Sequence, residues 1–115
     1  MHHQINYIEI PVQDLSACKA FFRDAFEWDF VDYGPDYASF NGAGIDGGIY
    51  KSDKSVQVES GSVLVVLYSN NLELSLERVV QCGAKIVKEI FSFPGGRRFH
   101  FCGPVGNEFA IWSDK

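Results

Sequence analysis

The stretch INYIEIPVQDLSACKAFFRDAF, residues 5–26, decides the fold because it holds a strand and a helix in immediate succession. In residues 5–12 isoleucine and valine alternate with other residues, which is the pattern of a strand with one buried face. Asp14 then has the side chain of a good N-cap, and apolar residues at helical spacing continue to about Phe26. The sequence therefore predicts a strand followed directly by an amphipathic helix.

The same pattern begins again in the second half of the chain. Residues 62–69, SVLVVLYS, are strongly β-prone, Asn71 is a second N-cap, and Gly83 is well placed to end the helix. Asp14 and Asn71 lie 57 residues apart, which is half of the 115-residue chain. Three strand candidates follow each helix, at 28–33, 37–41 and 47–50 in the first half and at 84–91, 97–102 and 107–112 in the second. We therefore expect a duplicated βαβββ unit.

This repeat defines the expected domain organisation. The two modules span about residues 4–51 and 62–113, and the polar stretch 52–61 joins them. A chain of 115 residues is of the length expected for one domain, so residues 1–115 are predicted to form a single domain.

Charge and composition exclude several classes of function. The formal net charge is −5 and no basic run is present, which argues against nucleic acid as a partner. No apolar run approaches the roughly 18 residues that a membrane span needs, and the first residues lack the pattern of a signal peptide. The three cysteines have no spacing typical of a zinc site, so we expect reduced thiols and a cytoplasmic protein.

Four segments, taken in order, resemble the vicinal-oxygen-chelate superfamily of glyoxalases, bleomycin-resistance proteins and dioxygenases. They are residues 8–28, the GGIY of 47–50, residues 70–87 and residues 94–112. The resemblance is closest to small single-domain glyoxalase-related proteins. It implies an α+β fold in which paired βαβββ modules form a curved mixed sheet around a cleft, with the helices on the outer face. It also implies a homodimer. One departure from the family pattern is Glu27, which stands where the first helix of this family usually ends in glycine.

The resemblance further points to four positions that hold a divalent metal in the metal-dependent members. Here these positions are Tyr7, Val65, a GGIY strand without a carboxylate, and Ala110. Valine and alanine cannot bind a divalent ion, and a neutral tyrosine is a poor ligand. The sequence therefore predicts a cleft with no metal and no other cofactor.

Two carboxylates are the candidates for chemistry in that cleft. Glu9 and Glu108 are predicted as general acid or base, because carboxylates partly buried among aromatic rings can have a raised pKa. The alternative is that both are rim groups bonded to backbone or water. The residues predicted to bind a ligand are Tyr7, Glu9, Trp28, Val65, Arg98, His100, Glu108, Ala110 and Trp112.

Two basic residues leave further alternatives open. Arg98 can hold a carboxylate or phosphate group of a ligand, or it forms a solvated surface pair with Arg97. His100 can join Glu9 and Glu108 as a non-standard metal ligand, or it is a structural residue.

Three functions remain open from the sequence, and whether the protein is an enzyme is undecided. The leading prediction is a glyoxalase-related protein that binds a small organic molecule in an aromatic, acidic cleft without the usual divalent metal. The second is a drug-binding protein of the bleomycin-resistance type. The third is a lyase, isomerase or dioxygenase with substituted metal ligands, including activity of the lactoylglutathione-lyase kind. In each case the predicted partner is a small molecule.

Overall fold

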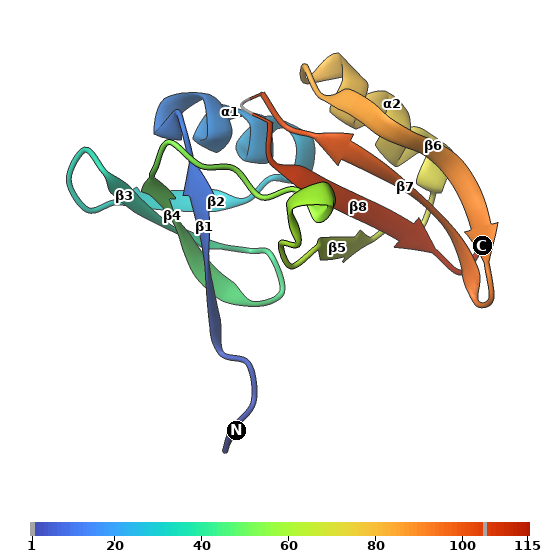
Figure 1. Cartoon of the computed structure of the whole chain (residues 1–115), viewed down its shortest axis with the longest axis horizontal. Helices are drawn as coiled ribbons and strands as arrows, with labels where there is room; N and C mark the ends of the chain where they lie inside the picture. Colours follow the sequence, from blue (N-terminus) through green and yellow to red (C-terminus); the bar gives the residue numbers. More distant parts are fainter. Residues whose placement is uncertain (1, 105) are drawn as a thin grey trace. The chain divides into compact units, whose positions relative to one another are not determined.

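The computed structural model describes residues 2–104 and 106–115, and the chain divides into two units, one ending at Ser55 and the other beginning at Val56. The elements of the first unit are β1 (Tyr7–Val12), α1 (Leu15–Phe26), β2 (Asp29–Asp32), β3 (Tyr37–Asn41) and β4 (Asp46–Lys51). Those of the second unit are the short 3-10 helix η1 (Val58–Ser60), β5 (Val65–Tyr68), α2 (Leu72–Gln81), β6 (Lys85–Phe93), β7 (Gly96–Cys102) and β8 (Glu108–Ser113). Figure 1 shows these elements along the chain. The predicted α+β class with two βαβββ modules is confirmed. That both units form one domain stays a prediction.

Unit 1 is built on a four-stranded mixed sheet in the order β1-β4-β3-β2, with β1 parallel to β4 and the other pairs antiparallel. Helix α1 begins where the sequence predicts, because the Asp14 carboxylate accepts a hydrogen bond from the Ala17 N–H at 3.0 Å. The helix ends at Glu27, whose φ of 61° is left-handed. Glycine favours this conformation, so Glu27 carries a backbone cost that a glycine there would not.

The core of unit 1 lies between α1 and one face of this sheet. Phe22 of α1 and Phe40 of β3 enclose the Trp28 ring, with ring centroids 4.7 and 5.0 Å away. Ile10 and Ile49 are almost fully buried on the neighbouring strands. Among the described residues, no helix of unit 1 covers the opposite face of the sheet, and we call it the open face of unit 1.

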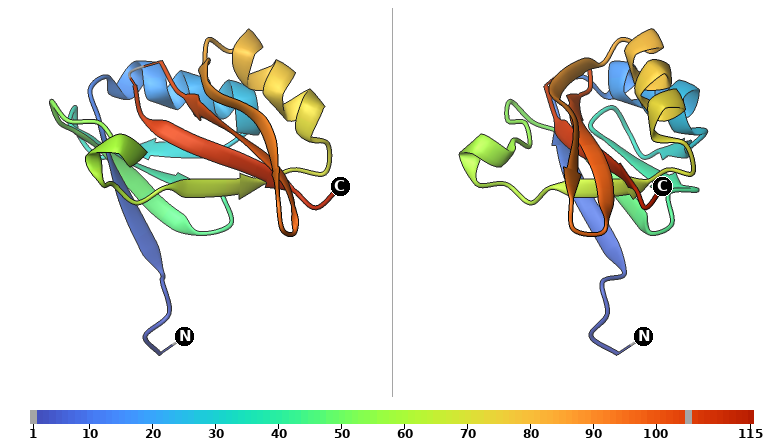
Figure 2. Two further views of the ribbon diagram at one scale, coloured as in Figure 1. Left: turned by 45° about the vertical axis from the view of Figure 1, so that its right-hand side comes forward. Right: turned by 90° about the vertical axis from the view of Figure 1, so that its right-hand side faces the viewer.

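Unit 2 repeats this plan with a sheet in the order β5-β8-β7-β6, in which β5 runs parallel to β8. Asn71 caps α2 by accepting from the Leu74 N–H at 3.1 Å, and Gly83 follows the helix with a φ of 100°. Val79 of α2 is buried, as are Phe99 and Phe109 on the facing side of the sheet. In Figure 2, α2 lies on one side of this sheet and η1 on the other. The side that carries η1 is the open face of unit 2.

The strand registers match the two sheets residue by residue. In unit 1, Ser39 pairs with Gly48, and in unit 2 the same positions are His100 and Ala110. Two residues further along each strand, Tyr37 pairs with Tyr50 in unit 1, and Arg98 pairs with Trp112 in unit 2. Paired residues point to the same face of a sheet, so these positions all lie on the open faces. We call β4 and β8, the second strand in each sheet order, the central strands of their units. Each begins with a carboxylate, Asp46 in β4 and Glu108 in β8.

Over the described residues, neither helix has the length and apolar character needed to cross a membrane.

Candidate functional site

A hydrogen-bonded group of two tyrosines and a carboxylate lies on the open face of unit 1. The Tyr37 hydroxyl donates to Oε2 of Glu9 at 2.9 Å, and it also forms a hydrogen bond with the Tyr7 hydroxyl. Because the single Tyr37 proton is directed at Glu9, Tyr7 is the donor in the second bond. The tyrosines come from β1 and β3, which are joined through the strand β4 between them. We call Tyr7, Tyr37 and Glu9 the phenol–carboxylate chain.

A glycine makes room for this arrangement. A Cβ atom on Gly48 would overlap the phenol end of Tyr37, so the ring lies over the central strand only because that side chain is absent. Burial of the hydroxyl and its hydrogen bonds to Tyr7 and Glu9 raise the pKa of Tyr37 well above its ordinary value. The Tyr37 phenol therefore keeps its proton at physiological pH and holds the Glu9 carboxylate in place.

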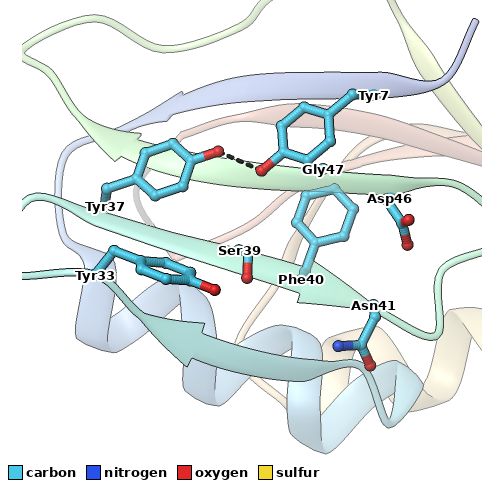
Figure 3. Close-up of a pocket in the computed structure, with 8 residues that line it drawn as sticks. All are labelled: Tyr7, Tyr33, Tyr37, Ser39, Phe40, Asn41, Asp46 and Gly47. Carbon is cyan, nitrogen blue, oxygen red and sulfur yellow. Dashed lines mark hydrogen bonds between the residues drawn. The ribbon is translucent and has the colours of Figure 1, made fainter.

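An open pocket of about 530 Å³ adjoins the chain (Figure 3). The residues that line it are Tyr7, Tyr33, Tyr37, Ser39, Phe40, Asn41, Asp46 and Gly47. The polar groups on its walls are phenols, a hydroxyl, an amide and one carboxylate, and none is cationic. We call this space the tyrosine pocket. Its walls offer hydrogen-bond partners and aromatic surface to a small molecule, and they suit a positive charge better than a negative one.

The open face of unit 2 holds a different arrangement, a buried histidine and glutamate. Nδ1 of His100 lies 2.8 Å from Oε2 of Glu108, and the two residues are only 1% and 6% exposed. The other carboxylate oxygen of Glu108 accepts from the Val58 N–H at 3.1 Å. Burial raises the pKa of Glu108, but the hydrogen bonds from His100 and Val58 and the charges of His100 and Lys88 outweigh it, so the pKa is lowered. Glu108 is therefore ionised and fully engaged.

The segment that donates a hydrogen bond to Glu108 belongs to the polar stretch 52–61, which the sequence predicts as a linker between the two modules. The Val56 N–H donates to Oδ1 of Asn107 at 2.6 Å, and the Glu108 N–H donates to the Val56 carbonyl at 2.7 Å. The Gln57 side chain adds a bond to the Gly106 carbonyl at 3.3 Å. Residues 56–61 thus form a strap fixed to the start of β8. A polar stretch rich in serine gives no sequence signal for such contacts, and the strap was missed.

The remaining predicted site residues divide between the two faces of their sheets. Trp28 is 5% exposed and belongs to the aromatic core under α1, not to an open face. Val65 pairs with Phe109, so its side chain lies on the helix-covered face, and Val66 takes the open face beside Ala110. Trp112 does lie on the open face, where its ring is 5.2 Å from that of Tyr68.

The misplacement of Val65 has a simple cause. The position seven residues before the helix cap is Tyr7 in the first module, but in the second module it is Leu64. A shift of one residue along a strand moves a side chain to the other face. Leucine is no better a metal ligand than valine, so the chemical argument is unchanged.

These residues do not fit the divalent metal that the fold family implies. Among the described residues of either unit, no group of three or more His, Cys, Asp or Glu side chains could hold a metal ion. The structure brings His100 together with Glu108 but joins Glu9 to Tyr37 instead. We therefore derive no step through a metal.

Comparison with known proteins identifies the family. Residues 4–111 match the model of the Glyoxalase/Bleomycin resistance protein/Dioxygenase superfamily, and the chain belongs to this family. A search of curated protein sequences returned no match.

Solved structures with the same fold are numerous but distant in sequence. A glyoxalase-related enzyme from Fulvimarina pelagi is 19% identical with a TM-score of 0.78, over 96% of this chain and 88% of that one. The fosfomycin resistance protein FosX from Listeria monocytogenes is 20% identical with a TM-score of 0.78, over 98% and 94%. A lactoylglutathione lyase from Agrobacterium tumefaciens is 16% identical with a TM-score of 0.72, over 96% and 93%. At these identities the likeness establishes the fold and not the activity.

Proposed function

We propose that this glyoxalase-family protein binds a small organic molecule with a cationic group in the tyrosine pocket, without a divalent metal. The observation that carries the proposal is the phenol–carboxylate chain at the edge of a pocket of about 530 Å³. A pocket of this volume lies within the range of roughly 300–1,000 Å³ that small-molecule sites occupy.

Charge supports a cationic ligand. Up to Ser55 the chain holds nine acidic and four basic residues, whereas from Val56 onward it holds six of each. The whole net charge of −5 is therefore carried by unit 1. Phenol rings attract cations through their faces, and Asp46 and Glu9 add formal negative charge near the pocket.

The alternative of a drug-binding protein has the same class of ligand, a cationic compound, but excludes any chemical change of that ligand. A sequestering protein of the bleomycin-resistance type binds a cationic compound and releases it unchanged. We extend the proposal to a homodimer and a cytoplasmic location, which the family resemblance and the reduced cysteines support.

Proton transfer is a second candidate because the chain of hydrogen bonds ends in a carboxylate. Glu9 accepts a hydrogen bond from Tyr37, which in turn accepts one from Tyr7, so the two phenols stabilise the ionised Glu9 carboxylate that would take a proton from a ligand and hold it. This function predicts that Glu9→Gln abolishes turnover while the phenols remain in place.

The test is calorimetric titration of EDTA-treated protein with benzyltrimethylammonium chloride. We expect saturable binding, and we expect Glu9→Gln and Tyr37→Phe to weaken it by up to about ten-fold each, because the first removes a negative charge beside the pocket and the second removes the hydroxyl that holds that charge in place. Asp32→Asn is the matched control, because Asp32 is an exposed carboxylate of the same unit that pairs with Lys19 away from the pocket. Absence of binding, or an equal loss in the control, would contradict the proposal.

A further inference from the structure

A second polar site lies on the open face of unit 2, where two buried nitrogen atoms lack hydrogen-bond partners among the described residues. They are Nε2 of His100 and Nε of Arg98. Both residues belong to β7, two positions apart, so their side chains leave the strand on the same side. A buried polar atom without a partner costs free energy, and such atoms are rare unless something binds them.

The histidine is held in one orientation by its neighbour. Oε2 of Glu108 lies 2.8 Å from Nδ1 of His100, and the second oxygen of the same carboxylate is fixed by the Val58 N–H. An ionised carboxylate can only accept a hydrogen bond, so Nδ1 carries a proton and Nε2 is the ring atom left for another partner. Glu108 is therefore a positioning residue, and His100 presents the functional atom.

The arginine is held in place by aromatic rings. Its guanidinium carbon lies 5.3 Å from the centre of the Phe91 ring and 5.6 Å from that of Phe93. Cation–π contacts of this kind fix the plane of the guanidinium while leaving its N–H groups free to donate. Two residues from β6 thus orient Arg98 as Glu108 orients His100.

The charges on this face favour an anion over a water molecule. Lys88 of β6 pairs with His100 in the sheet register, and it faces the same side as Arg98. Glu108, the carboxylate that adjoins His100, is already bonded to it. A bound water would satisfy the two nitrogen atoms but would leave the charge of the partly buried Arg98 guanidinium without a counter-charge.

We infer that Arg98 and His100 form a binding site for an oxyanion, the carboxylate or phosphate group of a small molecule, with Glu108 as the residue that positions the imidazole. The anion accepts one hydrogen bond from Nε of Arg98 and one from an N–H at Nε2 of His100. Charge-assisted bonds of this kind are among the strongest single contacts that a protein makes to a ligand. The site does not depend on the tyrosine pocket, whose polar groups select the opposite charge.

The experiment is nitrogen-15 NMR of the imidazole of His100 during separate titrations with sodium phosphate, sodium acetate and sodium chloride at constant ionic strength. We expect a saturable shift of the Nε2 resonance with phosphate or acetate and none with chloride. A response to phosphate alone identifies a phosphate group, and a response to acetate identifies a carboxylate.

Arginine variants supply the matched control. Arg98→Gln should weaken oxyanion binding by at least about ten-fold, the loss of one charged hydrogen bond. Arg97→Gln should leave it unchanged, because Arg97 is engaged by Glu73 and pairs with Ser113 on the other face. If Arg98→Gln does not fold, the titration of the unaltered chain still decides. No saturable shift with either oxyanion, the same response to chloride, or equal losses in both variants would overturn the inference.

Discussion

The two open faces of this protein share one topology and carry opposite chemistry. Ser39 and Asp46 in unit 1 occupy the positions that His100 and Glu108 occupy in unit 2. Asp46 is exposed at the tyrosine pocket, whereas Glu108 is 6% exposed and bonded on both oxygens. The difference lies in the strap of residues 56–61, which unit 2 places at the start of its central strand.

This comparison shows that the position of a residue in a repeat does not determine its role. A carboxylate at the start of the central strand lines a pocket in one unit and holds a buried histidine in the other. The small residue in the middle of that strand differs by one methyl group, Gly48 against Ala110, and the missing side chain of Gly48 leaves room for the Tyr37 ring. The two units share one frame, and the residues at equivalent positions set the charge and access of each face.

The largest expected effect is on the buried pair. His100→Phe should lower the free energy of unfolding by about 3 kcal/mol, because it leaves the Glu108 carboxylate buried with one partner lost. Ser39→Ala, at the equivalent position of unit 1, should change it by no more than about 0.5 kcal/mol. Urea denaturation of both variants measures this. Equal effects would show that the two faces are not as different as we describe.

The next effect is on ligand binding by unit 1. Gly48→Ala places a methyl group where the Tyr37 phenol lies, so the ring must move and the phenol–carboxylate chain breaks. We expect affinity for benzyltrimethylammonium to fall by up to about ten-fold, because the displaced ring no longer offers its face to the cation and no longer holds the Glu9 carboxylate in place. Ala110→Gly, the reciprocal change in unit 2, is the control and should leave this affinity unaltered. Calorimetry would contradict the account if Gly48→Ala bound the probe normally.

The strand-initial carboxylate of unit 2 should give a pH-dependent stability. The pKa of Glu108 is below its ordinary value of 4.5 in the folded protein, so its contribution is complete above that pH and is lost as pH falls through the folded pKa. Glu108→Gln should remove this part of the acid dependence. Thermal unfolding between pH 3 and pH 7 tests the sign, and stability of the unaltered chain that increased toward low pH over this range would exclude it.

Features that depend on residues close together in the sequence could be predicted, whereas features that depend on distant residues could not. Asp14 and Asn71 were identified as N-caps because capping acts within three residues, and both accept the expected backbone bond. Trp28 was ambiguous because apolar periodicity does not say which neighbour a ring will stack upon. Val65 failed because a one-residue shift in a strand changes the face.

The candidate sites were reached only in part for the same reason. Tyr7, Glu9, His100 and Glu108 were named from their residue types and their positions in strands. The partner of Glu9 was missed, because Tyr37 lies 28 residues away in sequence and approaches only over Gly48. The strap was missed because its bonds to Asn107 and Glu108 join residues about 50 positions apart.

The smallest expected effect concerns the link between α1 and Trp28. Glu27→Gly should raise the free energy of unfolding by up to about 1 kcal/mol, because glycine adopts the left-handed φ of 61° without the steric cost that Glu27 bears. Gly83→Ala, at the left-handed position after α2, should have the opposite sign. Urea denaturation of the two variants measures both signs, and a loss of stability in Glu27→Gly would contradict the argument.

The most direct test of the central claim is a pair of amide chemical-shift maps recorded on the same EDTA-treated, nitrogen-15-labelled protein. One titration uses benzyltrimethylammonium chloride and the other sodium phosphate. We predict that the cation shifts amides around Tyr7, Ser39 and Gly47, and that phosphate shifts amides around Arg98 and His100. A cation that maps to β7, or two probes that perturb the same residues, would contradict it.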